Sequence, residues 1–224
     1  MIGVLGGMGP LATAIFYAML TNKQKVSAEQ EHHDIIIYSK PSIPDRTAFI
    51  LGQSEISPLS DMIHVAKTLQ HAGASFIAIP CVTSHYFYQE IVQAVDIPVI
   101  HVVDEIAKHI FSKGFKKVGV LATNGTLAAG LFQNAFEKHD IEMLQLNAQK
   151  QTALMEIIYD IKHGQYIKSE NFDALEEALF CRGVQAVVLG CTELSMVTGP
   201  VIKERVDALE VLANVALEMS KKSP

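Results

Sequence analysis

The chain opens with Ile2-Gly-Val-Leu-Gly-Gly-Met-Gly-Pro-Leu-Ala12, and this stretch indicates the fold. The apolar run at residues 2–5 predicts a buried strand, the glycines that follow predict a tight turn, and the apolar spacing of residues 10–20 predicts a helix. Pro10 suits the first turn of that helix, because an N–H there would have no partner within the helix. A strand, a turn and a helix in this order begin a parallel βαβ unit.

The same alternation continues along the chain. Further strands are expected at residues 34–38, 76–79, 97–101, 117–121 and 184–189. Further helices are expected at residues 57–72, 84–95, 104–112, 126–138 and 206–220. Short apolar strands that alternate with amphipathic helices predict an α/β fold, with mainly parallel sheets flanked by helices.

The pattern restarts after residue 116, which indicates an internal duplication. Val4-Leu-Gly-Gly7 corresponds to Val120-Leu-Ala-Thr123, and the strand that runs into Cys81 corresponds to the strand that runs into Cys191. Two copies of one unit predict two pseudo-symmetric lobes. Ligands of parallel sheets bind at the carboxyl ends of the strands, so we expect the active site in the cleft between the lobes, with one cysteine from each.

Composition narrows the class of protein. The chain has 224 residues, is 49% hydrophobic and carries a net charge of −6. An acidic chain without a basic run is a poor binder of nucleic acid or of an anionic membrane. No apolar run is long enough to span a bilayer, and no basic segment precedes the first strand, so neither a membrane span nor a secretory signal is expected. Three cysteines suit a reducing cytoplasm.

Two familiar cofactor motifs are incomplete. Gly7-Met-Gly-Pro-Leu-Ala12 matches the dinucleotide pattern G-x-G-x-x-A, but the second strand ends in Ser39-Lys40 without the acid that holds the ribose. No Gly-Lys-Ser/Thr follows the glycines, which excludes a P-loop. The simpler interpretation is a tight turn that lets a small anion approach the backbone. No H-x-x-x-H or C-x-x-C spacing occurs, so no metal site is expected.

Cys81 and Cys191 are the candidate reactive groups, and Cys181 is expected to be structural. Buried cysteines are often simple core residues, but each of these two follows a strand, precedes an expected helix start and has a threonine within two residues. A helix N-terminus lowers the pKa of a thiol and favours the thiolate. A facing pair can remove a proton from one side of a carbon and deliver one to the other, without a cofactor.

Four motifs together resemble the aspartate/glutamate racemase family, which is independent of pyridoxal phosphate and uses two cysteines. They are Gly6-Gly-Met-Gly-Pro-Leu-Ala12, Ile43-Pro-Asp-Arg-Thr-Ala48, Pro80-Cys-Val-Thr-Ser-His-Tyr-Phe-Tyr88 and Leu189-Gly-Cys-Thr-Glu-Leu194, and they cover essentially the whole chain. Glutamate racemases carry an Asp-Ser-Gly turn after the first strand and a histidine after Cys-Thr. Gly6-Gly7 and Glu193 therefore place this chain closer to the aspartate racemase branch.

The resemblance implies roles for particular residues. Cys81 and Cys191 would be the acid/base pair, and Arg46 and Lys162 would hold the substrate carboxylates, although both can also be read as solvated surface residues. The substrate-binding residues implied are Met8, Arg46, Val82, Thr83, Thr126, Lys162 and Thr192. It also implies no cofactor, a homodimer, an amino-acid substrate, a first lobe of residues 1–100 plus 204–224 and a second lobe of residues 101–203.

Val82 departs from the family, which usually reads Pro-Cys-Asn-Thr at this point. An unpaired substrate group in a desolvated site costs about 1–3 kcal/mol, so the substitution leaves alternatives to aspartate open. They are a glutamate or hydantoin racemase, a maleate isomerase, or a catalytically impaired protein that binds a small carboxylate. Two neighbours add alternatives of their own. His85 can polarise the Cys81 thiol or face solvent or a carbonyl, and Glu193 can orient Cys191, receive its proton or make a structural hydrogen bond to the backbone.

Overall fold

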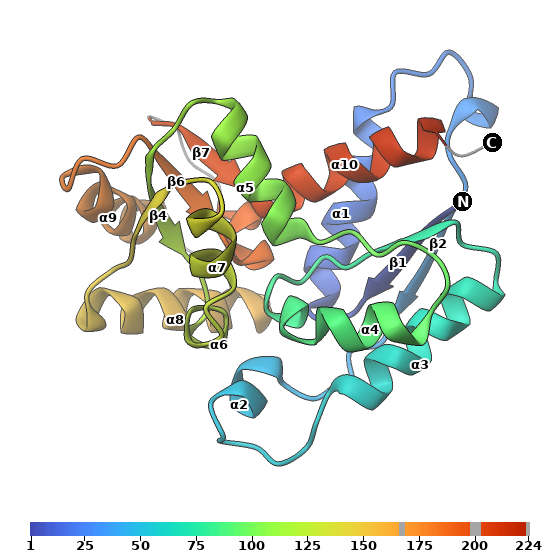
Figure 1. The fold of residues 1–224 in the computed structure, drawn as a ribbon, viewed down its shortest axis with the longest axis horizontal. Coiled ribbons are helices and arrows are strands. Elements are labelled where there is room, and N and C mark those ends of the chain that lie inside the picture. Colours follow the sequence, from blue (N-terminus) through green and yellow to red (C-terminus); the bar gives the residue numbers. More distant parts are fainter. Residues whose placement is uncertain (166–168, 198–202, 223–224) are drawn as a thin grey trace.

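A computed structural model describes residues 1–165, 169–197 and 203–222 and shows two lobes, each a parallel sheet flanked by helices (Figure 1). The strands of the first lobe are β1 (Ile2–Gly6), β2 (Ile35–Ser39) and β3 (Phe76–Ala78), in the order β2-β1-β3. Its helical segments are α1 (Pro10–Lys23), η1 (Glu29–Glu31), α2 (Arg46–Ile50), α3 (Leu59–His71), η2 (Thr83–Phe87) and α4 (Tyr88–Ala94). Every residue of β1 is buried, because this central strand is covered on both faces.

The second lobe repeats this plan. Its strands are β4 (Lys117–Leu121), β5 (Glu142–Leu144), β6 (Ala186–Leu189) and β7 (Arg205–Asp207), all parallel and in the order β5-β4-β6-β7. Its helical segments are α6 (Asn124–Ala128), α7 (Leu131–Glu137), α8 (Ala148–Lys162), α9 (Ser169–Phe180) and η3 (Thr192–Met196). β1, β2 and β3 of the first lobe thus correspond to β4, β5 and β6, as the internal duplication predicts.

Two helices connect the lobes. α5 (Val102–Ser112) follows the last extended segment of the first lobe and packs against α7 of the second lobe. α10 (Ala208–Lys222) follows β7 of the second lobe and packs against α1 of the first lobe and against α5 (Figure 1). Each lobe therefore sends its last helix to the other. The exact lobe boundaries, at residues 100 and 203, stay a prediction.

Side-chain packing follows the same division. One hydrophobic cluster contains residues of both lobes, among them Val4, Val120 and Leu212. A second cluster lies under α3 in the first lobe, and a third lies under α8 and α9 in the second. The two sheets are thus joined through one shared core, with a separate core on the far side of each.

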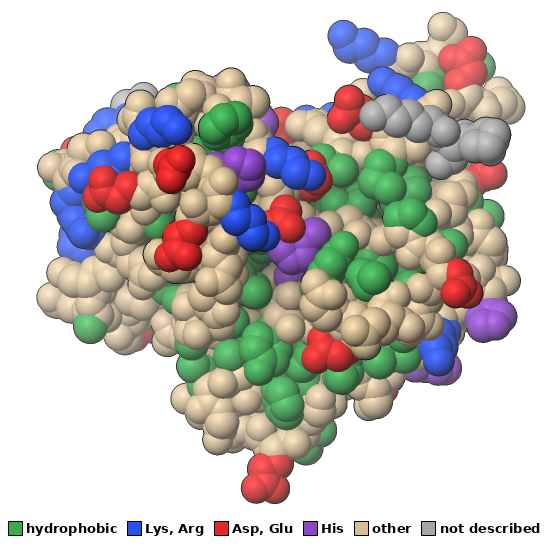
Figure 2. Space-filling model, in the orientation of Figure 1, with side chains coloured by type: hydrophobic (Ala, Val, Ile, Leu, Met, Phe, Trp, Pro, Cys, Tyr) green, Lys and Arg blue, Asp and Glu red, His purple; other side chains and the backbone are tan. Residues whose placement is uncertain are grey.

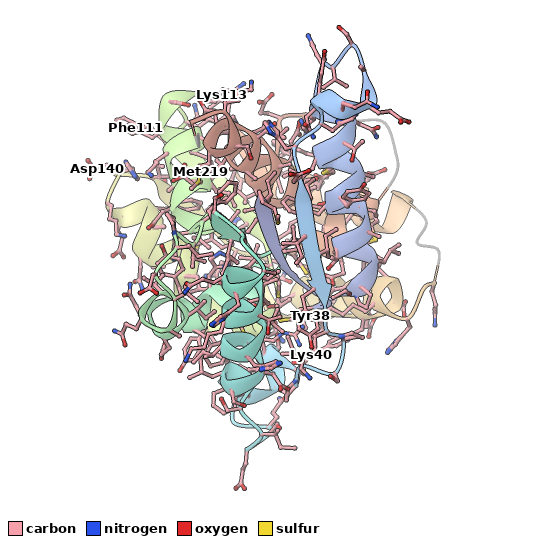
Figure 3. The ribbon with its side chains drawn as sticks, turned by 90° about the vertical axis from the view of Figure 1, so that its right-hand side faces the viewer. Tyr38, Lys40, Phe111, Lys113, Asp140 and Met219 are labelled. Carbon is pink, nitrogen blue, oxygen red and sulfur yellow. The ribbon has the colours of Figure 1, made fainter. Side chains whose placement is uncertain are left out.

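The turn after β1 explains the opening glycines. Gly7 has φ +95°, and a Cβ there would lie 2.4 Å from the backbone nitrogen of Lys40. A side chain at Gly6 would meet Thr13 in the same way. The Thr13 hydroxyl accepts from the Gly7 N–H at 2.9 Å and donates to the Gly9 carbonyl at 2.9 Å. Figure 3 shows Tyr38 and Lys40 at the end of β2 beside this turn, with α1 and α3 on opposite sides of the sheet.

Several expected elements differ from those observed. The helix expected at residues 84–95 is the 3₁₀ segment η2 followed by α4. The helix expected at residues 126–138 is split into α6 and α7 by Gly130, which has φ +63°. Residues 97–101 form no strand and make only a single parallel bridge, Ile77 to Val99, at the place that β7 occupies in the second lobe. β5, α8 and β7 were not expected from the pattern, whereas α9 agrees with the helical segment expected to end near Cys181.

The surface carries charges of both signs. In the view of Figure 2, lysine and arginine side chains lie among aspartate and glutamate side chains, and apolar side chains gather over α2 and α4. In the part of the chain that the structure describes, no helix is long and apolar enough to cross a membrane.

Candidate active site

Cys81 and Cys191 occupy equivalent positions in the two lobes. Cys81 follows β3 and Cys191 follows β6, each at the carboxyl end of a strand that pairs with the central strand of its sheet. Both thiols are free, and their residues are only 6% and 5% exposed. Cys181, in contrast, is exposed and donates to Glu177. The duplication therefore delivers one buried thiol from each lobe.

The loops that carry the two cysteines contact each other directly. The hydroxyl of Thr192, next to Cys191, donates to the carbonyl of Pro80, next to Cys81, at 3.2 Å. Both partners of this hydrogen bond lie in the buried region between the lobes. The structure thus brings the two candidate reactive loops together at the lobe interface.

Three threonine hydroxyls close a second contact between the lobes. The hydroxyls of Thr83, Thr123 and Thr126 lie 2.9–3.0 Å from one another, and all three residues are buried. Thr83 belongs to the first lobe, whereas Thr123 and Thr126 belong to the start of α6. Beside them α2 approaches α6 closely, since a Cβ on Gly125 would lie 2.8 Å from the Cα of Thr47. Two predicted substrate-binding residues, Thr83 and Thr126, therefore sit in this hydroxyl cluster.

Cys191 is paired with Glu193. Its thiol donates to Glu193 Oε2 at 3.0 Å, while Glu193 Oε1 is buried without a hydrogen-bond partner. Burial, reinforced by the negative charge of Glu193, raises the pKa of Cys191 well above its usual value. The expectation that a helix start would favour the Cys191 thiolate is therefore wrong. The following helix, η3, is a five-residue 3₁₀ segment, and its contribution is outweighed by desolvation and by the carboxylate.

Arg46 lies at the start of α2 and turns inward. It is 8% exposed, and its guanidinium donates to the carbonyls of Ile43 at 3.2 Å, Pro44 at 2.8 Å and Met8 at 3.4 Å. Its Nε–H is buried and has no partner. The reading of Arg46 as a solvated surface residue is thus wrong, and one of its buried donors is left for another group.

Lys162, at the end of α8, interacts electrostatically with the two cysteines, with Glu193 and with Arg46. Burial alone would lower the pKa of Lys162, but the charges of Glu193, Cys191 and Cys81 outweigh this and raise it, while Arg46 acts in the opposite direction. The Lys162 ammonium also lies 5.2 Å from the centre of the Tyr159 ring. A cation from the second lobe is therefore close to both thiols and to Arg46.

Tyr159 belongs to the same neighbourhood and was not singled out from the sequence. Burial, with the charges of Asp45 and Cys191 in support, raises the pKa of its phenol, and Lys162 and Arg46 oppose that shift. Tyr159 precedes Lys162 by three residues, so both project from one face of α8. If Lys162 is assumed to be a site residue and its segment a helix, this spacing of three residues identifies Tyr159 from the sequence.

Met8 and Val82 are both buried, at 3% and 2% exposure. The sulfur of Met8 accepts from the Ser84 hydroxyl at 3.4 Å, and its carbonyl accepts from Arg46. Val82 belongs to the hydrophobic cluster shared by the two lobes. Its immediate surroundings are therefore apolar.

His85 faces backbone carbonyls, which is one of the two expectations for it, and it does not contact the Cys81 thiol. Its Nδ1 lies 3.1 Å from the carbonyl of Cys81 and 3.2 Å from that of Val82, and its Nε2 accepts from the Val102 N–H at 3.3 Å. The ring thus binds the backbone on both sides. Among the residues that the structure describes, no group of three His, Cys, Asp or Glu side chains is arranged to hold a metal ion.

Comparison with known proteins gives consistent matches. A family model for Asp/Glu/hydantoin racemases matches residues 5–216, a range that contains both cysteines. The broad specificity amino-acid racemase RacX of Bacillus subtilis is 30% identical over 204 residues, which cover 88% of this chain and 87% of RacX. Glutamate racemase of Corynebacterium glutamicum is 28% identical over 175 residues, covering 76% of this chain and 62% of that enzyme. Aspartate racemase of Picrophilus torridus has a TM-score of 0.89 at 26% identity and covers 98% of this chain and 94% of its own.

Proposed function

The chain belongs to the Asp/Glu/hydantoin racemase family and is an amino-acid racemase, and we propose that it racemises an acidic amino acid, aspartate first, by a two-base reaction between Cys81 and Cys191. The observation that carries this proposal is the hydrogen bond from Thr192 to the Pro80 carbonyl. It ties together the loops of two buried thiols that come from opposite lobes, as a reaction on two faces of one carbon requires.

The proposed reaction needs one thiolate and one thiol. The thiolate removes the α-proton, the electron pair of the broken C–H bond is delocalised into the carboxylate, and the opposite thiol delivers its proton to the other face of the carbon. The hydrogen bond from Cys191 to Glu193 supports Cys191 as the acid in the state described here. Cys81 is then the base, and after one turnover the two cysteines have exchanged protonation states, ready for the other enantiomer.

The charges around the thiols support an acidic substrate. Lys162 and the unpartnered Nε–H of Arg46 supply positive charge and a free donor in a chain that is acidic overall. Two cations suit two carboxylates, and a guanidinium is the better partner for a carboxylate because it donates in a fixed, planar geometry. This arrangement favours a dicarboxylate over a hydantoin.

A second candidate is racemisation of a wider range of amino acids. It is favoured by the three hydrogen bonds that Arg46 makes to backbone carbonyls, which give this residue a role in holding the loop whatever the substrate side chain is. The likeness to the broad specificity enzyme RacX agrees with it. The two candidates differ in the ratio of activity on aspartate to activity on alanine.

Exchange of the α-proton in heavy water tests the proposal. We expect exchange with aspartate, and we expect Cys81→Ala and Cys191→Ala each to lower racemisation at least about 10²–10⁴-fold, the usual contribution of an acid or base. Cys181→Ala is the matched control, because Cys181 is exposed and outside the site. Racemisation at near wild-type rate in either of the first two variants would exclude the two-base reaction.

We further propose that the enzyme needs no cofactor, acts as a homodimer and is cytoplasmic. Activity after dialysis against a chelator and treatment with hydroxylamine, which removes pyridoxal phosphate, tests the first point. Light scattering of the purified chain gives its mass in solution, and localisation of a tagged chain tests the third. A loss of activity after either treatment would contradict the absence of a cofactor. A monomeric mass would contradict the homodimer, and a tagged chain in the membrane or secreted fraction would contradict a cytoplasmic location.

A further inference from the structure

Glu193 leaves one carboxylate oxygen unused. Oε2 accepts from the Cys191 thiol at 3.0 Å and lies 3.5 Å from the Thr192 hydroxyl, but Oε1 is buried without a partner. The residue is only 3% exposed. Buried polar atoms in native structures almost always have a hydrogen-bond partner, and a charged oxygen left without one is especially unfavourable. An unfilled acceptor at this place therefore points to a donor that arrives with a ligand.

Oε1 faces the glycine turn. It lies 3.2 Å from the point where a Cβ on Gly9 would stand, so no side chain of the turn stands between its backbone and the oxygen. Lys162 is near enough for the Glu193 charge to raise its pKa, but no salt bridge joins the two in the described part of the chain. Oε1 is thus bordered by the backbone of the turn and, in the described part of the chain, makes no hydrogen bond with a side chain.

Arg46 supplies a complementary group. Arg46 Nε–H is a buried donor without a partner, as Glu193 Oε1 is a buried acceptor without one. A ligand that carries both a carboxylate and a cationic donor fills both. An α-amino acid zwitterion carries an ammonium and a carboxylate on the same carbon, and an acidic amino acid carries a second carboxylate on its short side chain. A cyclic ureide has neither charge, and an unsaturated dicarboxylate has no cation.

We propose that Glu193 Oε1 binds the α-ammonium group of the substrate, which restricts the site to free α-amino acids. The inference rests on the proposed function, because it concerns the same site. One carboxylate then contacts both the thiol of Cys191 and the ammonium of the bound substrate. This shared contact places the α-carbon, which bears the ammonium, next to the acid that protonates it. Glu193 is thereby a substrate-binding residue as well as the partner of Cys191.

The test compares two ligands that differ by the ammonium group. Binding of L-aspartate and of succinate is measured by titration calorimetry on Cys81→Ala, in which turnover is blocked, and on the same chain with Glu193→Gln added. We expect the second change to weaken L-aspartate by about 10- to 100-fold, the size of a hydrogen bond to a charged group. Succinate has no ammonium, so its affinity stays the same or rises as a negative charge is removed.

Two further variants keep the result interpretable. Glu176→Gln changes another buried glutamate of the second lobe, one that is bonded to Arg205 away from the thiols, and it should leave the aspartate-to-succinate ratio unchanged. Glu193→Asp retains the charge and should recover part of the preference for aspartate; thermal melts show that each variant is folded. Equal weakening of both ligands by Glu193→Gln would overturn the inference.

The two proposals fail separately. Exchange of the α-proton by the wild-type chain decides the racemisation, whereas the ligand pair on the Cys81→Ala background decides the ammonium contact. A chain that shows no exchange but loses aspartate selectively with Glu193→Gln retains the contact and loses the proposed reaction. If the wild-type chain exchanges the proton but Glu193→Gln does not change the ligand preference, the proposed reaction is retained and the ammonium contact is excluded.

Discussion

At the scale of single residues, Val82 is the departure that most affects the choice of substrate. It is 2% exposed and lies in the hydrophobic cluster that both lobes share. Apolar neighbours stabilise a buried valine, whereas the asparagine usual in the family has a donor and an acceptor that both need hydrogen-bond partners. The structure gives a packing reason for valine here that is independent of the substrate.

We predict that Val82→Asn destabilises the protein. An amide without partners in this cluster costs about 1–3 kcal/mol, which in a chain of this length corresponds to a fall in Tm of about 2–12 °C. Calorimetry of the variant measures the fall, and the rate on a panel of amino acids measured beside it reports on the substrate. An unchanged Tm with a faster reaction on aspartate would show instead that position 82 faces the ligand.

The residues of the site were predictable to different degrees. Cys81, Arg46 and Lys162 stand in motifs that can be read along the chain, and the structure places all three in one electrostatic neighbourhood. The protonated state of Cys191 was not predictable, because it depends on burial and on a carboxylate whose orientation only the folded chain fixes. Tyr159 lacked a motif of its own, and its contact with Lys162 follows only from the geometry of α8.

At the scale of elements, His85 connects η2 with the segment that leaves the first lobe. Nδ1 faces the carbonyls of Cys81 and Val82, and Nε2 faces both the Ile100 carbonyl at 3.2 Å and the Val102 N–H at 3.3 Å. The ring also packs edge-on against His101, 5.3 Å between centroids. The imidazole therefore couples the backbone of the Cys81 loop to the start of α5.

Because of these contacts, we predict an acid-sensitive stability that depends on His85. Burial, with the nearby charge of His101 in support, lowers the pKa of His85 to about 4. The unfolded chain binds the proton from about pH 6.5 downward while the folded chain does not, so stability is present above pH 6.5 and is lost as the pH falls toward 4. The loss amounts to about 3 kcal/mol and appears in urea midpoints measured across this range.

The variant His85→Asn should flatten this dependence. Its amide can donate to the Cys81 carbonyl in place of the ring, but it has no proton to bind in this range, so the variant is less stable than wild type at pH 7 and closer to it at pH 4.5. His71→Asn, at an exposed position on α3, is the control and should keep the wild-type slope. Parallel curves for wild type and His85→Asn would contradict the prediction.

The order of strands and helices was predictable, but their limits were less so. β4 was expected at the residues it occupies, since an apolar run bounded by polar residues is a strong signal. β5 and β7 are three residues long, too short for alternation to appear. Gly130 interrupts apolar spacing that continues on both sides of it, so α6 and α7 resembled one helix until the left-handed backbone at Gly130 was seen.

At the scale of the whole molecule, the two lobes share their largest core. That cluster includes Val4 of β1, Val120 of β4 and Leu212 of α10, and α5 and α10 pack against each other across it. α5 follows the first lobe in sequence but packs against α7 of the second lobe, and α10 follows the second lobe but packs against α1 of the first. Neither sheet can therefore lose its structure without exposing apolar side chains of its neighbour.

This sharing predicts one cooperative unfolding transition. Calorimetry should show a single peak whose van't Hoff enthalpy equals its calorimetric enthalpy. Leu212→Ala, at a position only 1% exposed, should shift that peak as a whole by about 4–20 °C, because a buried leucine-to-alanine change costs about 2–5 kcal/mol. Leu11→Ala is the matched control, since Leu11 lies on α1 and is 51% exposed. Two separate peaks, of which Leu212→Ala moves only one, would show that the lobes unfold independently and that the shared core does not join them.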